Sequence, residues 1–146
     1  MCPNFFLWPT KRIIGCAHSG WKGALNGIIE NTVRKFFDLN SNIDDLIAVV
    51  GPCIAKEHYE VKTDFLKKFI DKNKSNEKFF KKKSVYKYLF DLRGFINKEI
   101  SNLKIKNIEN IELDTFSEQK LFYSYRRSRL NDEDDYGRCI SVILMT

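Results

Sequence analysis

The chain has 146 residues, of which 43% are hydrophobic and 30% charged. This balance is expected of one globular domain, residues 1–146, and excludes a mainly disordered polypeptide. Its longest apolar runs, such as Leu46 to Val50, are far shorter than the roughly 18 residues that a membrane-spanning helix needs. Near Met1 the positive charges follow the apolar run instead of preceding it, the wrong order for a signal peptide. We therefore expect a cytoplasmic location and no membrane partner.

The net charge of +6 is concentrated in one segment. Between Lys62 and Phe90 there are ten lysines against three acids, and no arginine. Because the whole chain favours Lys, Ile, Asn and Phe, a bias that AT-rich coding produces, we interpret the segment as a solvated face. The alternative is a polyanion-binding surface, such as one for nucleic acid.

The first half of the chain predicts a strand, a helix and a second strand. Residues Arg12 to Ala17 form a short apolar run, and Trp21 to Leu39 repeat apolar residues at spacings of three and four. Leu46 to Val50 indicate a buried strand that ends at Gly51 and Pro52.

The second half predicts helices over Lys62–Asn73 and Asp91–Leu103, a polar loop over Lys72–Ser84, and strands over Ile108–Leu113 and Arg138–Met145. Strands that alternate with helices indicate an α/β (α+β) domain with helices packed on a mixed sheet. Ligands of such sheets bind beyond the carboxyl ends of strands. Side chains from the turns after the first two strands should therefore converge.

Several residues in and near these turns suit chemistry. His18 could act as a metal ligand or a general base, while Trp21 and Lys22 offer a stacking face and a cation. Cys53 stands at a strand end, five residues before His58, and is a candidate thiolate or metal ligand. The alternative for each is a purely structural role.

The segment from Phe122 to Arg129 combines aromatic rings with arginines. Tyr123 and Tyr125 could stack on a base, and Arg126 and Arg127 suit phosphate or carboxylate. In a strand, adjacent residues point to opposite faces, so at most one of the two arginines should line a given cleft. Pairing of the arginines with the acids at 132–135 is the alternative.

The four cysteines, Cys2, Cys16, Cys53 and Cys139, form no CxxC pair. Scattered cysteines favour reduced thiols over a disulfide framework. Cys16 and Cys139 lie in strand-like runs and should be buried.

Five motifs, in this order, resemble one family. They are HSGWKG (His18–Gly23), GPCI (Gly51–Ile54) with YEV (Tyr59–Val61), DL (Asp91–Leu92), FYSYRR (Phe122–Arg127), and GR (Gly137–Arg138) before a final hydrophobic run. They are similar to HAGWRG, GPCI with YEV, DL, FFSYRR and GR of the laccase-domain family. Its members were formerly described as multicopper polyphenol oxidases and are now described as broad-specificity purine nucleoside phosphorylases.

The resemblance implies a three-layer α/β/α fold and a zinc-dependent enzyme. Such an enzyme cleaves adenosine or inosine with phosphate to the free base and ribose 1-phosphate, with adenosine deamination as an additional activity. It also implies that His18 is a zinc ligand. With a complete site, Lys22, Arg126 and Arg127 would serve as cations and Cys53 as a thiol at the substrate, while Trp21, Tyr123 and Tyr125 would stack on the base.

The departure from the family concerns the metal site. Family members have a longer N-terminal part with two more zinc ligands, a histidine in a VHG-like motif and a cysteine in an ADCxP-like motif. Pro3 matches the proline of the second motif, so Met1 stands at the place of the cysteine. The site would need residues from the missing part or from a homodimer partner.

Two alternatives remain from other classes. One is an inactive truncated remnant or half of a split enzyme, for which the apolar residues Phe5 to Trp8 near the N-terminus would be exposed. The other is copper-dependent oxidation of phenols, which four scattered cysteines and two histidines support poorly.

Overall fold

A computed structural model describes residues 2–40 and 42–146, so Met1 lies outside the described residues. Its main sheet has the strand order β2-β1-β3-β7. The strands are β1 (Cys2–Trp8), β2 (Ile13–Ser19), β3 (Ile47–Val50) and β7 (Asn107–Asn110). β1 runs antiparallel to both β2 and β3, and β7 runs parallel to β3. The predicted α/β class with a mixed sheet is thus confirmed.

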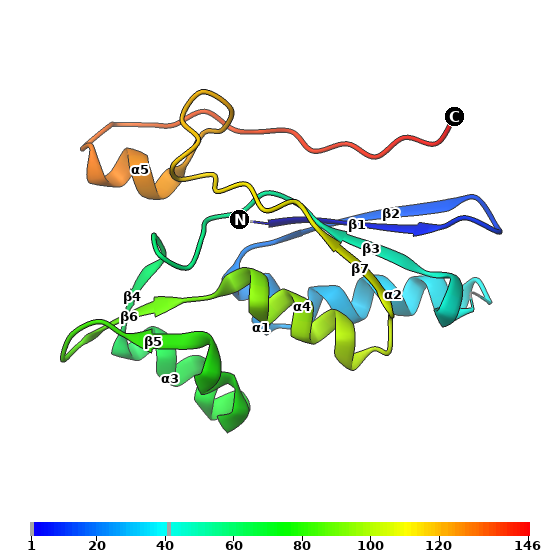
Figure 1. Cartoon of the computed structure of the whole chain (residues 1–146), viewed down its shortest axis with the longest axis horizontal. Helices are drawn as coiled ribbons and strands as arrows, with labels where there is room; N and C mark the ends of the chain where they lie inside the picture. Colours follow the sequence, from blue (N-terminus) through cyan, green and yellow to red (C-terminus); the bar gives the residue numbers. More distant parts are fainter. Residues whose placement is uncertain (1, 41) are drawn as a thin grey trace.

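Three helices lie on one side of this sheet: α1 (Trp21–Leu25), α2 (Ile28–Asp38) and α4 (Leu92–Asn102). Figure 1 shows the C-terminal part of the chain running along the other side. Helix α2 contacts β2 and α4 contacts β3. The helix predicted over Trp21–Leu39 is interrupted, because Gly27 takes a left-handed conformation with φ of 83° between α1 and α2.

A second, smaller sheet has the order β4-β6-β5. It comprises β4 (Glu60–Lys62), β5 (Phe80–Lys82) and β6 (Lys87–Phe90), and α3 (Thr63–Lys72) accompanies it. The prediction of a polar loop over Lys72–Ser84 is wrong in part, because this region contains the 3-10 helix η2 (Lys74–Phe79) and β5. Buried phenylalanines hold these elements together: the ring of Phe69 lies 4.8 Å from that of Phe90 and 5.0 Å from that of Phe95.

The N-terminal residues form the centre of the main sheet, which the sequence did not predict. Phe6 and Trp8 on β1 are buried, with 0% and 3% of their surface exposed. The expectation that this apolar run is exposed is therefore wrong, because β1 pairs on both edges. The predicted burial of Cys16 and Cys139 is wrong as well, since both are exposed, while Cys2 and Cys53 are buried.

The C-terminal third departs most from the predicted strands. β7 starts one residue before the strand predicted from Ile108. Earlier in the chain, a short 3-10 helix, η1 (Ile43–Asp45), precedes β3. The aromatic and arginine segment forms a helix, α5 (Tyr125–Leu130), because Ser124 caps it by accepting a hydrogen bond from the amide of Arg127 at 3.3 Å. Residues 138–145, predicted as a strand, belong to no ladder among the described residues. No helix in the described part of the chain has the length and hydrophobicity to cross a membrane.

Candidate functional site

The site begins with the topology of the main sheet. Because β2 and β3 both run antiparallel to β1, they are parallel to each other and their carboxyl ends meet at one edge. His18 lies near the end of β2, where it pairs with Pro3, and Trp21 starts α1 two residues after β2 ends. Pro52 and Ile54 follow β3. The two turns therefore converge as the sequence predicted.

A cavity of about 640 Å³ opens beyond these strand ends. It brings together five of the residues singled out in the sequence, namely His18, Trp21, Tyr123, Tyr125 and Arg126. Tyr59, Phe65 and residues 136–141 complete much of the wall. Lys22, Cys53 and Arg127 are not among the residues that line it.

Trp21 is held in place by the aromatic core of the smaller sheet. Its ring lies 4.8 Å from that of Phe65 on α3. Two ammonium groups flank the indole, with Lys22 Nζ at 5.5 Å and Lys68 Nζ at 5.1 Å from the ring centre. Lys22 is exposed and contacts the Trp21 ring without lining the cavity itself.

Arg126 and Tyr59 lie together in the wall, which also contains the charged residues Glu60, Lys62 and Arg138. The guanidinium carbon of Arg126 lies 5.5 Å from the centre of the Tyr59 ring, a cation–π contact. Burial raises the pKa of the Tyr59 hydroxyl to about 12, against the opposing influence of the Arg126 charge. Tyr59 therefore stays protonated near neutral pH and can donate a hydrogen bond, while Arg126 remains available for an anion.

Arg127 has a structural task instead. Its guanidinium donates hydrogen bonds to the carbonyl oxygens of Thr115 at 3.1 Å, Phe116 at 2.6 Å and Phe122 at 2.6 Å. These bonds fix the turn at 115–116 against the start of α5. The expectation that only one of the adjacent arginines lines the cleft holds, although the segment is a helix rather than a strand.

His18 is exposed at the cavity wall. Partial burial lowers the pKa of its imidazole below the ordinary value, since desolvation disfavours the cation. The neutral ring offers one N–H donor and one lone pair to a ligand.

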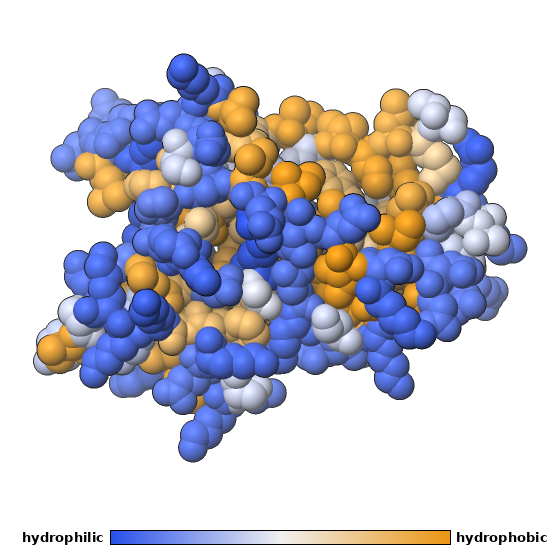
Figure 2. Space-filling model, viewed as in Figure 1, coloured by the Kyte–Doolittle hydropathy of each residue, from blue (hydrophilic) through white to orange (hydrophobic). Residues whose placement is uncertain are grey.

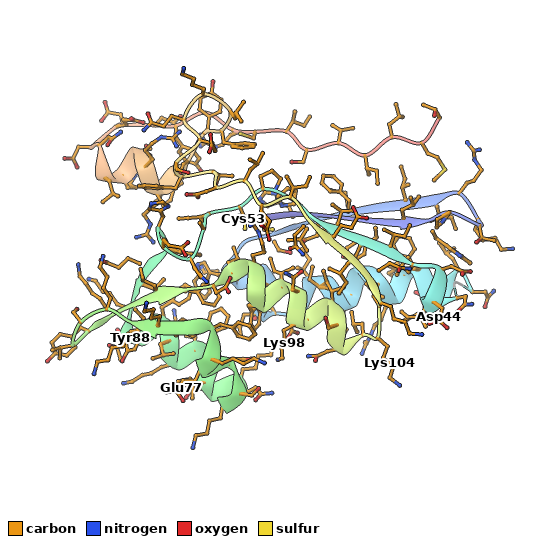
Figure 3. All side chains as sticks on the ribbon, viewed as in Figure 1. Asp44, Cys53, Glu77, Tyr88, Lys98 and Lys104 are labelled. Atoms are coloured by element: carbon orange, nitrogen blue, oxygen red, sulfur yellow. The ribbon has the colours of Figure 1, made fainter. Side chains whose placement is uncertain are left out.

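Cys53 lies in the interior, where the chain leaves β3 (Figure 3). A hydrogen bond from the Cys2 thiol lowers the pKa of Cys53 to about 7, with the Arg93 charge helping against the effect of burial. The same contact raises the pKa of Cys2. Cys53 is fully buried and is absent from the cavity lining, so it lies behind the wall rather than in it.

The pairing of His58 with Asp114 was not predicted. His58 Nδ1 lies 2.6 Å from Asp114 Oδ2, and the imidazole stacks on Phe116 with ring centres 4.5 Å apart. Asp114 Oδ1 accepts the amide hydrogens of Ala55 and Phe116, both at 2.9 Å, and these bonds hold the pKa of Asp114 low despite its burial. Asp114 is 56 residues from His58 in the sequence, and no local pattern indicates the contact.

The residues present do not by themselves fit a metal centre. Among residues 2–40 and 42–146 there is no group of three or more His, Cys, Asp or Glu side chains placed to hold an ion. His58 is bound to Asp114, and Cys53 faces Cys2 and Arg93 instead of His18. We therefore derive no reaction step through a metal.

The cavity at the strand ends of this mixed sheet, lined by aromatic rings and by Arg126 and Arg138, lies where α/β proteins commonly bind small molecules. More specifically, the chain belongs to the family described as multi-copper polyphenol oxidoreductase laccase, whose sequence profile matches residues 2–146. The recognition made from the motifs is thus confirmed.

Several known proteins are similar to this chain. A purine nucleoside phosphorylase of Rickettsia conorii is 38% identical over 135 residues, which cover 92% of this chain and 55% of the relative. The purine nucleoside phosphorylase YfiH of Escherichia coli is 29% identical, with 97% and 54% covered. The crystal structure of a Bacillus licheniformis protein named YfiH superimposes with a TM-score of 0.81 at 31% identity, over 88% of this chain and 49% of that one. This chain thus spans about half the length of the relatives it matches.

Proposed function

We propose that this chain supplies the substrate cavity of a purine nucleoside phosphorylase. The observation that carries the proposal is the cavity itself, because Arg126, Trp21, Tyr123 and Tyr125 all line it. A purine nucleoside presents a flat aromatic base, and its second substrate, phosphate, is an anion. The names of the Rickettsia and Escherichia relatives support the same reaction class.

The reaction needs little covalent chemistry from the protein. A phosphate oxygen attacks C1′ of the ribose, the bond from C1′ to the base nitrogen breaks, and the base leaves with the electron pair and takes up a proton. Arg126 holds the phosphate with its planar fork, and the tyrosine and tryptophan rings hold the base. Tyr59, protonated near neutral pH, and neutral His18 supply hydrogen-bond donors to the leaving base or to the ribose.

We propose that the three candidate residues outside the cavity lining support the residues that form it. Lys22 acts through Trp21, Arg127 positions α5, and Cys53 supports Tyr59 from behind the wall. We propose that His18 binds zinc only when ligands outside this chain are supplied. Such an ion would act as a Lewis acid and would suit the deamination of adenosine as an additional activity.

The test is release of adenine from adenosine by the purified chain, with and without phosphate. We expect release that depends on phosphate and falls by about tenfold or more in His18→Ala, because the neutral imidazole at the cavity is lost. His58→Ala is the matched control, since His58 lies outside the cavity wall and pairs with Asp114.

Two results would contradict the proposal. One is adenosine left intact by folded protein at every phosphate concentration, and the other is oxidation of a phenol with copper in place of phosphorolysis. Equal loss in the two histidine variants would show that the effect comes from folding rather than from the cavity.

A further inference from the structure

The last residues of the chain have the sequence of a central strand but not its surroundings. In the segment 139–146, Ile140, Val142 and Leu144 form one apolar side, and Cys139, Ile143 and Met145 make the other side apolar except at Ser141. Strands with two apolar faces are found where both faces of a sheet are covered. Here Ile140, Val142 and Leu144 expose 89%, 70% and 80% of their surface.

Figure 2 shows hydrophobic residues along the upper right of the molecule, where this segment runs in Figure 1. Three large apolar side chains side by side on an extended chain form a continuous patch, which monomeric proteins seldom leave uncovered.

The backbone of the segment is unpaired too. Among the described residues, no backbone group of 140–146 bonds to another backbone group, and the segment joins no sheet. Two contacts hold it at its ends: Arg12 donates to the carbonyl oxygen of Thr146 at 2.7 Å, and the amide of Tyr123 lies 3.4 Å from Cys139 Sγ. A row of free amide and carbonyl groups is a template for strand pairing.

The main sheet offers a second open edge. β2 is a terminal strand of its sheet, and it borders a hollow of about 490 Å³ that is lined by Ile13 and Ile14 together with residues of α2 such as Phe36. Strand β2 carries no charged residue that would discourage pairing, apart from His18 when protonated. The exposed segment and the terminal strand β2 are therefore two places where a further strand could pair.

We propose that residues 139–146 pair, as a β-strand, with a polypeptide equivalent to the part of the family that this chain does not span. The amount of chain favours this occupant, because a little under half of the Rickettsia conorii relative lies outside the match. That is enough for several strands and a covering layer. A second copy of this chain fits less well, since each copy carries a net charge of +6. The inference rests on exposure and length, not on the proposed activity.

The experiment mixes the 146-residue chain with the portion of the Rickettsia conorii relative outside the matched 135 residues. Light scattering gives the mass of the complex, and hydrogen exchange gives the protection of the amides at 140–145. We expect a one-to-one complex in which the exchange of these amides is slowed by about tenfold or more.

Variants locate the contact. Val142→Lys should weaken the complex by about tenfold or more, because the interface would bury an unpaired ammonium group. Val85→Lys is the matched control, since Val85 also exposes 70% of its surface but lies between β5 and β6. Both variants should keep the melting temperature of the isolated chain.

A single-chain fusion, with the relative's portion joined ahead of Cys2, allows hydrogen exchange at 140–145 to be measured independently of the affinity between the two polypeptides. Protected amides at 140–145 in the fusion would support the proposal, and fast exchange in both formats would overturn it. A self-dimer of the chain that Val142→Lys dissociates, or equal weakening by Val85→Lys, would overturn it as well.

Discussion

At the residue scale, two adjacent arginines of one motif have different roles. Arg126 lines the cavity beside Tyr59, whereas Arg127 is bound to three backbone carbonyl oxygens. In a helix, successive residues are rotated by about 100°, so neighbours face different surroundings. The guanidinium of Arg127 thus stabilises the backbone behind the wall, and that of Arg126 is left to face the cavity.

The phosphate-binding role that we propose for Arg126 leads to a prediction. Arg126→Lys should raise the dissociation constant for inorganic phosphate by about tenfold, because the ammonium keeps the charge but loses the planar fork that binds two oxygens. Titration calorimetry with phosphate measures this without turnover. Arg129→Lys, on the same helix but outside the cavity wall, should leave phosphate affinity unchanged. An unaltered affinity in Arg126→Lys would assign the anion elsewhere.

At the element scale, the connection between α1 and α2 decides where Trp21 stands relative to the amphipathic face of α2. The turn depends on Gly27, whose φ of 83° is costly for any residue with a Cβ atom. The sequence pattern favoured one helix because the apolar spacing continues through the break. Backbone sterics at a single residue set the interruption.

Gly27→Ala should therefore lower the free energy of unfolding by about 1–2 kcal/mol, measured by chemical denaturation. Gly23→Ala is the control in the adjoining helix. A Cβ at Gly23 would lie 3.6 Å from the nearest atom of Ile28, an ordinary contact, so this change should be neutral or stabilising by about 0.5–1 kcal/mol. Equal destabilisation by both variants would show that the left-handed turn is not the cause.

At the scale of the whole molecule, one aromatic cluster connects the two sheets. Phe69 is fully buried and contacts Phe80 and Phe90 of the smaller sheet, Phe95 on α4, and Trp21 beside the cavity. The lysines of the same segment lie on its outer surface; Figure 3 shows Tyr88 and Glu77 of this segment at the periphery, away from Cys53. The basic face borders the cavity at one end, because Lys62 lines the cavity and the Lys68 ammonium lies 5.1 Å from the centre of the Trp21 ring.

This connection predicts that the two sheets unfold together. Phe69→Ala should cost about 3–5 kcal/mol of unfolding free energy and lower a single thermal transition. Phe37→Ala, at a residue with 41% exposure, should change stability by less than about 0.5 kcal/mol. Two separate transitions in the Phe69 variant, read by calorimetry, would show that the sheets are independent units.

The sequence by itself determined the elements whose apolar pattern is local. The strands near Arg12–Ala17 and Leu46–Val50, and the helices near Lys62–Asn73 and Asp91–Leu103, lie where their periodicity places them, within one or two residues. It also determined the family, because the motifs HSGWKG, GPCI and FYSYRR are contiguous. His18, Trp21, Tyr123, Tyr125 and Arg126 were found in this way and meet at one cavity.

Only the tertiary structure decided which of the chemically able residues reach the cavity. Cys53 turns inward to Cys2, His58 turns to Asp114, and Arg127 satisfies distant carbonyl groups, because each partner is remote in sequence. Phe6 and Trp8 are buried because β1 has a neighbour on each edge, whereas the equally apolar residues 139–146 have none. Burial of a strand depends on its partners in space, and a pattern of side chains cannot specify which partners the chain provides.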